Sequence, residues 1–463
     1  MSTSERIPAI PTGLLLTDLY QLNMMQAYLD SGMTGTAVFE FFVRKLPAQR
    51  NFLLSAGLAQ VMRFLQEARF EPAELEWLRT SGRFSESFVD YLADFRFAGD
   101  VHAIPEGTAV FPNEPVLRVT APLPMAQLLE TRLINLLHTS VLVASKAARM
   151  VLAAPDKRLV DFGLRRAHGS EAGLLAAHAA YMAGFAGTAT VPAAPLWDIP
   201  IMGTMAHSFV EAHEDESRAF LDFARSRPQE VVLLIDTYDV RRAARTVVDI
   251  APVLEREGIT VKGVRIDSGD LPQLAREVRE ILDKGGLPHV SVLASGGLDE
   301  WKLRDFTDAG APIDGYGIGT ALTTSEDAPA LDCAYKLQEY DGRMTRKLSS
   351  GKATWPGRKQ VWRTYGSDGS IAGDVISLED DDQPGTPLVE KVMEDGRPLG
   401  EVPTLAAARE RAAAQLAALP PRLRALEPAE AYPVAVSDLL QRTADEVARE
   451  IDRRGHRGEV PAK

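Results

Sequence analysis

A single histidine, His207, stands in the run Gly203–Ser208, where the other side chains are small or apolar. The run has the composition of a strand end or a buried turn, so a strongly polar side chain is unexpected there. Imidazole changes its protonation near neutral pH more readily than other side chains, which suits it to catalysis. A histidine in such a place is more often a hydrogen-bonded core residue, so its role depends on the residues that the fold brings to it.

Four aspartates follow two apolar segments that are expected to be strands. Asp236 and Asp239 follow one segment, and Asp267 and Asp270 follow the next. Carboxylates at strand ends can bind Mg²⁺ or sugar hydroxyls and can stabilise a developing positive charge. They can equally cap the helices that come after them. We expect capping for Asp239 and Asp270, and we expect Asp236 and Asp267, which follow their strands directly, to belong to the site.

Arginines accompany these acids. Arg265 alternates with Val264 and Ile266 and therefore points to the other face of its expected strand. An arginine inside a fold is costly unless it meets an anion, and its planar fork matches a carboxylate or a phosphate. Arg165 and Arg166 follow a similar apolar segment, and the sequence does not say which of the two faces the site.

Two glycine-rich turns follow the last two expected strands. In a β/α barrel these positions commonly form a phosphate site, because glycines let backbone N–H groups close on an anion and a helix N-terminus adds its dipole. Either turn alone is a weak signal, since glycines also end strands for steric reasons. Together they predict phosphate binding by Ser295, Gly296, Gly297, Gly317, Gly319 and Thr320.

Aromatic residues near these anion sites suggest a flat, ring-shaped ligand. Tyr20 and Phe162 are candidates for stacking on such a ring, although each fits a core position equally well. Three later lysines, Lys347, Lys352 and Lys359, could bind a substrate diphosphate across an interface or lie in solvent. The sequence leaves their roles open.

The elements that must position these residues alternate between strand and helix. Short apolar segments at 158–162, 231–235, 261–266, 290–294 and 316–318 each end in a polar or glycine-rich turn before a helical stretch. This rhythm predicts a parallel β/α barrel, whose active site gathers at the carboxyl ends of the strands. Fewer than eight strands are evident, so we expect an irregular barrel. An open doubly wound sheet is the alternative.

The flanking segments predict a second α/β domain. A long helix is expected over residues 124–149, and an amphipathic surface helix over residues 405–454. We expect an N-terminal α/β domain over residues 1–125, completed by part of the C-terminal segment. The barrel is expected over residues 126–335, and C-terminal strands and helices over residues 336–463 that pack on the N-terminal domain.

Composition bounds the class of protein. The 463 residues carry a formal charge of −13 with a single cysteine, Cys333, which excludes a disulfide framework or thiolate metal site within one chain. An acidic chain with a pI near 5.3 argues against a nucleic-acid partner. The apolar stretch from Leu133 to Val151 is interrupted by polar residues such as Lys146 and Arg149, so we expect no membrane span. No secretory signal is evident, and a cytoplasmic enzyme is expected.

Taken in order, the motifs resemble those of a known family. They are Thr17–Tyr20, Phe39–Phe42, Glu130–Thr131, Asp161–Arg166, Gly203–Ser208, Asp236–Asp239, Gly263–Asp270, Ser295–Leu298 and Gly317–Thr320. As a set they resemble nicotinate phosphoribosyltransferase, over roughly residues 12–440. The resemblance implies an irregular β/α barrel joined to an α/β domain built from both ends of the chain. It also implies a homodimer whose active sites lie at the subunit interface.

The implied reaction is the attack of nicotinate on C1 of 5-phosphoribosyl 1-diphosphate, giving nicotinate mononucleotide and diphosphate with coupled ATP hydrolysis. This reaction serves NAD salvage. The resemblance implies that His207 is phosphorylated by ATP, as a covalent intermediate. Thr204 and Arg265 would contact nicotinate, while Phe162 and Tyr20, the latter lent by the partner subunit, would sandwich its ring.

The remaining implied roles concern phosphate and ribose. The turns Ser295–Gly297 and Gly317–Thr320 would hold the 5-phosphate, and Arg165 would lie near the phosphates. Asp236 and Asp267 would face the ribose, Mg²⁺ and the positive charge that develops at C1. Mg²⁺ is the implied cofactor and ATP the co-substrate, with no dedicated protein cage for the metal.

Several alternatives remain. Nicotinamide and quinolinate phosphoribosyltransferases are the nearest, but Ala189 stands where nicotinamide-using relatives can carry an aspartate, and a carboxylate there would repel nicotinate. An aldolase-type barrel would need a Schiff-base lysine, yet Lys157 and Lys262 lie at the amino ends of their expected strands. A catalytically inactive relative would show damaged His207 or phosphate motifs, and these motifs are intact.

Overall fold

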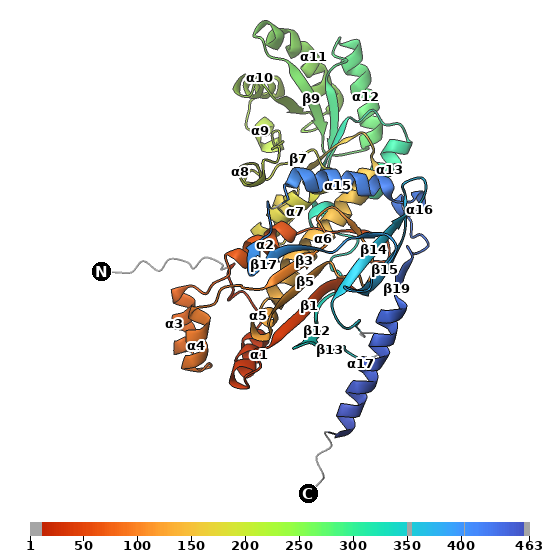
Figure 1. The fold of residues 1–463 in the computed structure, drawn as a ribbon. Coiled ribbons are helices and arrows are strands. Elements are labelled where there is room, and N and C mark those ends of the chain that lie inside the picture. The colour runs from red at the N-terminus through yellow and green to blue at the C-terminus, as the bar shows by residue number, and fades with distance from the viewer. Residues whose placement is uncertain (1–11, 350–353, 402, 458–463) are drawn as a thin grey trace, which may run out of the picture. The chain divides into compact units, whose positions relative to one another are not determined.

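The computed structural model describes residues 12–349, 354–401 and 403–457. The chain divides into two compact units. Unit 1 comprises Met1–Val141, Ala330–Leu423 and Ala429–Lys463, and unit 2 comprises Leu142–Pro329 and Arg424–Pro428. The first division falls inside α6 (Glu130–Ala153), a helix drawn at the middle of Figure 1. The domain limits expected from the sequence stay a prediction.

Unit 2 is built on a six-stranded sheet in which every pair of neighbours is parallel. Its strands, in chain order, are β6 (Arg158–Asp161), β7 (Gly187–Thr188), β8 (Val231–Leu234), β9 (Val261–Ile266), β10 (Ser291–Ser295) and β11 (Gly315–Ile318). Five of them match the strands expected from the sequence. The sixth, β7, is too short for its apolar pattern to stand out.

The strand order β7-β6-β11-β10-β9-β8 decides between the two expected topologies. Apart from β7 and β8, each strand lies beside the next one in the chain, and the last strand, β11, returns to pair with the first, β6. This is the cyclic order of a β/α barrel that is opened between β7 and β8, whereas a doubly wound sheet reverses direction at its centre. The expected α/β fold with an irregular barrel is therefore confirmed, and the doubly wound alternative is wrong.

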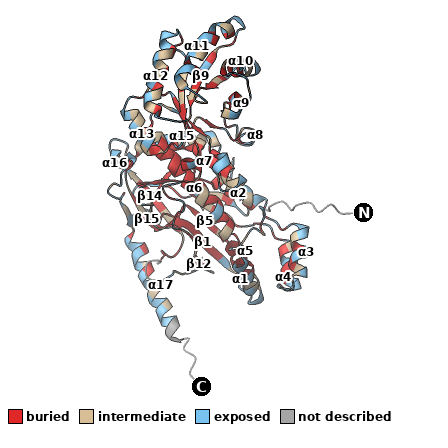
Figure 2. Ribbon diagram, turned by 180° about the vertical axis from the view of Figure 1, so that it is seen from behind, coloured by how far each residue is buried: buried red, intermediate tan, exposed pale blue. Residues whose placement is uncertain are grey.

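Helices cover the outside of this sheet, and their residue patterns explain why they form. In α11 (Val240–Arg256) the buried residues Ala243, Val247 and Leu254 recur at helical spacing. In α12 (Leu271–Lys284), Ala275, Val278 and Leu282 do the same. Figures 1 and 2 show these two helices beside β9, with exposed residues on their outer faces.

The other helices of unit 2 range from three to fourteen residues in length. They are η1 (Leu164–Arg166), α7 (Ser170–Ala183), α8 (Ala193–Trp197), α9 (His207–Glu211), α10 (Glu216–Ser226), α13 (Glu300–Asp308) and α14 (Thr320–Thr323). Three of them, α8, α9 and α10, belong to the connection from β7 to β8. The segment with His207 thus lies in the connection across the opening of the barrel.

Unit 1 combines strands from both ends of the chain. Its largest sheet has the order β13-β12-β1-β5-β3-β17-β18, and a four-stranded sheet has the order β16-β14-β15-β19. In the large sheet, Phe39 of β1 and Tyr335 of β12 stack with ring centroids 4.9 Å apart. The strands are β1 (Thr36–Val43), β2 (Leu53–Leu54), β3 (Asp100–Ala103), β4 (Ala109–Val110), β5 (Leu117–Pro122), β12 (Cys333–Tyr340), β13 (Arg343–Met344), β14 (Lys359–Tyr365), β15 (Ile371–Leu378), β16 (Thr386–Pro387), β17 (Glu390–Glu394), β18 (Arg397–Pro398) and β19 (Val434–Val436).

Two expected helices of the flanking segments are interrupted. The helix expected over 124–149 is two helices that meet at Leu129. The helix expected over 405–454 is interrupted between Ala418 and Asp438 by the short helix Pro421–Arg424, the strand Val434–Val436 and irregular segments that contain Pro420, Pro428 and Pro433. The helices outside unit 2 are α1 (Leu19–Asp30), α2 (Leu58–Gln66), α3 (Pro72–Thr80), α4 (Glu86–Ala93), α5 (Leu123–Leu128), α15 (Leu405–Ala418), α16 (Pro421–Arg424) and α17 (Asp438–Arg457).

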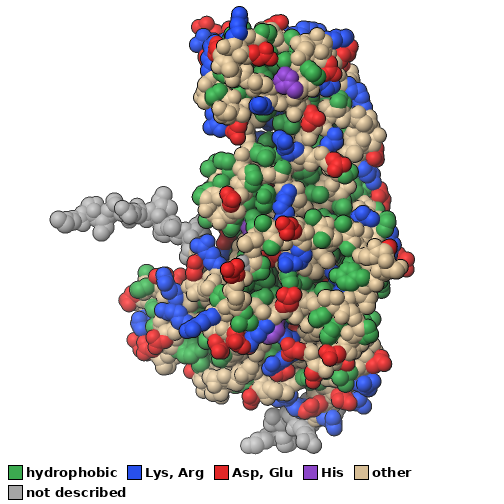
Figure 3. All heavy atoms as spheres, turned by 45° about the horizontal axis from the view of Figure 1, so that its top comes forward, with side chains coloured by type: hydrophobic (Ala, Val, Ile, Leu, Met, Phe, Trp, Pro, Cys, Tyr) green, Lys and Arg blue, Asp and Glu red, His purple; other side chains and the backbone are tan. Residues whose placement is uncertain are grey.

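Helix α6 is the one helix, among the described residues, that is long and apolar enough to cross a membrane. However, 78% of its apolar window is buried inside the protein, as in the core helix of a globular protein. Figure 3 shows Lys and Arg side chains interspersed with Asp and Glu on one face of the molecule. The expectation that the chain binds neither a membrane nor a nucleic acid stays a prediction.

Candidate active site

Three cavities that share lining residues lie along the sheet of unit 2. The first extends from the amino ends of the strands, at Arg158 and Lys262, to Phe162 and Arg265, whereas the second and third lie at the carboxyl ends. Their volumes are about 250, 180 and 560 Å³, and all three are lined by Phe162 and Arg265. Phe162 follows β6 and Arg265 lies near the end of β9, so the strands themselves bring the two side chains together. They form the centre of the site.

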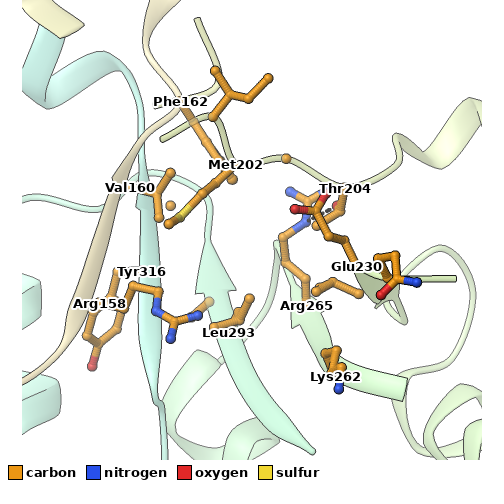
Figure 4. A pocket seen from close by; sticks show the side chains of 16 residues that line it. Arg158, Val160, Phe162, Met202, Thr204, Glu230, Lys262, Arg265, Leu293 and Tyr316 are labelled. Atoms are coloured by element: carbon orange, nitrogen blue, oxygen red, sulfur yellow. Dashed lines mark hydrogen bonds between the residues drawn. The ribbon is translucent and has the colours of Figure 1, made fainter. Parts of the chain in front are cut away.

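The first cavity is suited to a flat ring. Arg265 lies with its guanidinium carbon 6.0 Å from the centroid of the Phe162 ring. Its Nε donates to Thr204 Oγ1 at 3.1 Å, and its Nη2 donates to the carbonyl of Met205 at 2.7 Å. Figure 4 shows Thr204 beside Arg265, with Phe162 above them. An aromatic face and a guanidinium edge are the groups that would hold an aromatic carboxylate.

Arg265 also joins this cavity to the acids. Its Nη1 donates to Asp267 Oδ1 and to Ser295 Oγ, both at 3.1 Å, and the Ser295 hydroxyl in turn donates to Asp267. Burial lowers the pKa of Arg265, opposed by the charges of Asp267 and Asp236. The guanidinium is thus fixed by several short contacts without a bidentate carboxylate partner.

The second cavity has the form of an anion site. It is lined by Ser295, Gly296, Gly297, Gly317, Gly319 and Thr320, together with Arg165 and Arg166. Gly296 has a φ of +97°, and a Cβ there would lie 2.0 Å from the carbonyl oxygen of Asp267. A Cβ on Gly317 would lie 2.4 Å from the Phe162 ring. Both positions therefore require glycine, and their backbones stay open to the cavity.

The turn that carries Phe162 is held by Asp161, a residue whose role the sequence analysis did not assign. Its Oδ1 accepts from the N–H of Gly163 at 2.8 Å, and its Oδ2 accepts from Thr188 Oγ1 at 2.6 Å. Burial raises the pKa of Asp161. Asp161 is the last residue of β6. Its position at the carboxyl end of a strand, close to those of Asp236 and Asp267 after theirs, was the signal that could have identified it.

The two acids chosen from the sequence lie together. Asp236 Oδ2 accepts from the backbone N–H of Asp267 at 3.0 Å and from Ser268 Oγ at 2.6 Å. Asp236 Oδ1 is buried and accepts no hydrogen bond within the described part of the chain. The neighbouring Asp239 and Asp270 cap α11 and α12, each accepting from a backbone N–H in the first helical turn. The expected division between site and capping acids is confirmed for these two caps.

His207 begins α9 and lines the third cavity. Its Nδ1 lies 3.1 Å from Thr237 Oγ1, and its Nε2 lies 4.0 Å from Asp267 Oδ2. The imidazole side chain is 40% exposed, so one ring nitrogen is accessible while the other is fixed by Thr237. Thr237 was not chosen from the sequence, although it directly follows Asp236, which was.

Most residues predicted from the sequence thus lie around one set of cavities. Asp236 lines none of the three cavities but accepts a hydrogen bond from Asp267, which does. Tyr20 lies on α1 in unit 1, where it is 47% exposed. The predicted contact of Tyr20 with a ring bound to a partner subunit stays a prediction. Ala189 lines the third cavity, and its N–H donates to the carbonyl of Asp161 at 2.7 Å.

The lysines have different settings. Lys359 is buried in unit 1, where its Nζ lies 2.7 Å from Glu40, so it is engaged in the core. Lys347 is exposed, and Lys352 lies outside the described residues. Lys262 stands near the start of β9, away from Phe162, and Lys157 precedes β6. Neither Lys157 nor Lys262 is at the carboxyl end where a barrel enzyme would use a Schiff-base lysine.

Comparisons with known proteins agree with this arrangement. Family models described as the nicotinate phosphoribosyltransferase N-terminal domain, family and C-terminal domain match residues 15–138, 157–346 and 385–444. The nicotinate phosphoribosyltransferase pncB2 of Mycobacterium tuberculosis is 48% identical over 439 residues, 94% of each chain. That of Bacillus subtilis is 39% identical over 377 residues, 79% of this chain and 76% of the relative.

A solved structure extends the likeness to three dimensions. The crystal structure of human nicotinic acid phosphoribosyltransferase is 30% identical and superimposes with a TM-score of 0.85, covering 93% of this chain and 100% of the human one. The family model that matches residues 157–346 spans the site residues of unit 2. The chain belongs to the nicotinate phosphoribosyltransferase family.

Proposed function

We propose that this protein is a nicotinate phosphoribosyltransferase that acts in NAD salvage. The pyridine nitrogen of nicotinate attacks C1 of 5-phosphoribosyl 1-diphosphate, the C1–O bond breaks, and diphosphate leaves. The observation that carries the proposal is the joint position of Arg265 and Phe162, which line all three cavities. One cavity suits the ring and its carboxylate, and its neighbour suits the 5-phosphate.

The carboxylates supply charge where the reaction needs it. Departure of diphosphate leaves positive charge on the ribose, so a nearby carboxylate stabilises the transition state more than the ground state. Asp236 and Asp267 are linked by a 3.0 Å hydrogen bond and stand beside the phosphate turns. The pyridine nitrogen is already nucleophilic, so no general base is assigned.

Mg²⁺ is the proposed cofactor. No group of three or more potential metal ligands occurs among the described residues, so a dedicated protein cage is not expected. The buried, unpartnered Oδ1 of Asp236, with Asp267 beside it, fits the one or two carboxylates that Mg²⁺ uses together with substrate phosphates. The ion would neutralise the diphosphate as it leaves.

His207 is the proposed link to ATP, which acts as a co-substrate. His207 Nδ1 lies 3.1 Å from Thr237 Oγ1. In the proposed tautomer the Nδ1–H group donates to that hydroxyl, and the lone pair on Nε2 attacks the γ-phosphorus of ATP. The bond between the γ-phosphorus and the β–γ bridging oxygen breaks, and ADP leaves. The phosphoryl group later passes from His207 to water. Hydrolysis of the phosphohistidine would supply free energy for the formation of the mononucleotide.

Further parts of the proposal concern assembly and specificity. The protein is proposed to be a cytoplasmic homodimer. In this dimer Tyr20 of one subunit stacks on the ring bound in the partner's site, as the family resemblance implies. Ala189 lines the third cavity without a charge. A neutral side chain there favours the acid over the amide as substrate, because a carboxylate would repel nicotinate.

The test is product formation from 5-phosphoribosyl 1-diphosphate and Mg²⁺ with nicotinate, nicotinamide or quinolinate, each with and without ATP. Mononucleotide from nicotinate, increased by ATP with release of phosphate, is the expected result. Turnover of nicotinamide alone would contradict the role of Ala189. Turnover of quinolinate alone would assign a different activity, and no turnover with any base would identify an inactive relative.

A further inference from the structure

One buried lysine connects the two segments that follow the phosphate turns. The Lys146 side chain of α6 is only 2% exposed. Its Nζ lies 2.6 Å from Glu300 Oε2 and 2.8 Å from Asp327 Oδ1. Glu300 is the first residue of α13, which follows the turn Ser295–Gly297, and Asp327 follows α14, which begins at Thr320. One ammonium group therefore holds the segments that come after both turns.

A second cation of α6 completes this cluster. Arg149 Nε donates to Glu300 Oε1 at 3.1 Å, and its Nη atoms donate to the carbonyl of Leu426. Lys146, Arg149, Glu300 and Asp327 are all buried within unit 2. Two positive and two negative charges balance, so the cluster introduces no net charge into the core.

Stability alone does not account for such a cluster. Replacing a buried ion pair with well-packed apolar residues is often neutral or stabilising, because the desolvation cost can exceed the Coulombic gain. What the ion pairs add is geometry, since a buried ammonium group keeps its carboxylate partners at contact distance, here 2.6 and 2.8 Å. In this chain the partners fixed are those that present the two anion-binding turns.

We propose that Lys146 is a positioning residue that sets the distance between the turns Ser295–Gly297 and Gly317–Thr320. Through that distance it determines the affinity for the phosphate group of the phosphoribosyl substrate. Backbone N–H groups bind an anion well only when they converge on it, and a small displacement of one turn loses that convergence. The inference rests on the proposed function, because it names a determinant of the same site.

Unit 1 offers a matched control. Lys359 and Glu40 form another buried lysine–carboxylate pair, with 4% and 0% side-chain exposure and a 2.7 Å contact. Removing Lys359 leaves a buried carboxylate unpaired, as removing Lys146 does. Lys359 lies in the other unit, on β14, and borders none of the three site cavities. A general loss of stability should therefore appear in both variants, and an effect on phosphate binding in only one.

The experiment compares Lys146→Met with Lys359→Met in the full chain. We expect Lys146→Met to raise the KM for 5-phosphoribosyl 1-diphosphate by about tenfold or more, with the KM for nicotinate changed by less than about twofold. Lys359→Met should lower the thermal midpoint comparably and leave both KM values near wild type. Lys146→Arg, which keeps the charge, should recover part of the substrate affinity.

A second variant protects the test against misfolding. In Lys146→Met combined with Asp327→Asn, no charge of the cluster is left unpaired, because Glu300 keeps its ion pair with Arg149. The raised KM for the phosphoribosyl substrate should persist. Equal KM values for the two single variants, or a folded double variant with wild-type KM, would overturn the inference.

Direct binding separates this inference from the proposed function. Calorimetry with ribose 5-phosphate should show weaker binding by Lys146→Met and unchanged binding by Lys359→Met. If wild type binds ribose 5-phosphate but forms no mononucleotide from any base, the proposed function fails while the positioning role stands. If both variants bind it as tightly as wild type, the positioning role fails whatever the activity.

Discussion

Two arginines, one in each unit, show how similar sequence settings lead to different roles. Arg363 on β14 is fully buried and forms a two-pronged pair with Asp374, with Nε–Oδ1 and Nη2–Oδ2 distances of 3.0 and 2.6 Å. Its guanidinium carbon lies 5.6 Å from the centroid of Phe111. Arg265 on β9 also faces an aromatic ring and lies near an aspartate, yet it borders three cavities.

The difference lies in what satisfies the guanidinium. Burial opposes the charge of Arg363, but hydrogen bonds and charge from Asp374 outweigh it and raise its pKa. Burial instead lowers the pKa of Arg265, whose donors are spread over Thr204, Met205, Asp267 and Ser295. An arginine with a dedicated carboxylate is committed to the core, whereas one with dispersed partners beside a cavity can accept a ligand anion.

The most direct way to break this comparison is to remove each guanidinium. Arg265→Met should lower kcat/KM for nicotinate by about 10²- to 10³-fold, because a desolvated partner of the substrate carboxylate is lost. Its thermal midpoint should change little. Steady-state kinetics and thermal unfolding on the same preparation measure both effects.

Arg363→Met is the matched control. It should lower the free energy of unfolding by about 3–5 kcal/mol, since Asp374 is left buried without its partner. The folded fraction should keep the wild-type kcat/KM for nicotinate. A large kinetic defect in Arg363→Met, with normal kinetics in Arg265→Met, would reverse the assignment of the two arginines.

A carboxylate of the site should behave differently from the arginine. Asp236→Asn should lower kcat by about 10²-fold, because the variant stabilises the charge at C1 less well. The KM for nicotinate should stay within about twofold of wild type, since Asp236 does not line the ring cavity. A change confined to KM would place Asp236 in substrate binding instead of transition-state stabilisation.

The coupling role of His207 gives a further prediction. His207→Ala should bring the ratio of rates with and without ATP to about one, because the nucleophile for the γ-phosphate is absent. Some ATP-independent formation of nicotinate mononucleotide should remain, since Arg265 and the phosphate turns are unchanged. Full ATP stimulation of His207→Ala, measured with labelled ATP, would disprove the phosphohistidine.

The smallest expected effect concerns a histidine of unit 1. Burial and the charge of Arg118 lower the pKa of His102 to about 4, against an ordinary value of 6.5. Between about pH 4 and pH 6.5, His102 is therefore protonated in the unfolded chain but neutral in the folded chain. Stability should fall as pH falls through this window, by roughly 1 kcal/mol per pH unit from this group.

His102→Gln should flatten that slope in unfolding experiments at a series of pH values. The pH dependence of kcat/KM should be unaffected, because His102 lies on β3 of unit 1 and lines none of the site cavities. An unchanged slope in His102→Gln would assign the loss of stability at low pH to other groups.

The sequence by itself determined the local features of this protein. Alternating apolar segments located five strands of the barrel, and the turns after them identified the aspartates and glycines that gather in unit 2. His207 stood out as the one strongly polar side chain in the run Gly203–Ser208. The capping roles of Asp239 and Asp270 were also readable, because a cap depends only on backbone N–H groups a few residues away. Local patterns predict what local contacts decide.

Tertiary structure decided whatever depends on residues distant in the chain. The opening of the barrel between β7 and β8 follows from which strand edges pair, and the helix expected over 124–149 breaks at Leu129, where the sequence has no proline. Lys146 and Arg149, which looked like polar interruptions of an apolar helix, are partners of acids far along the chain. The sequence left the role of Lys359 open, and the structure places Glu40 beside it. The sequence shows which side chains are charged. Only the fold shows whether each of them is paired, buried or exposed.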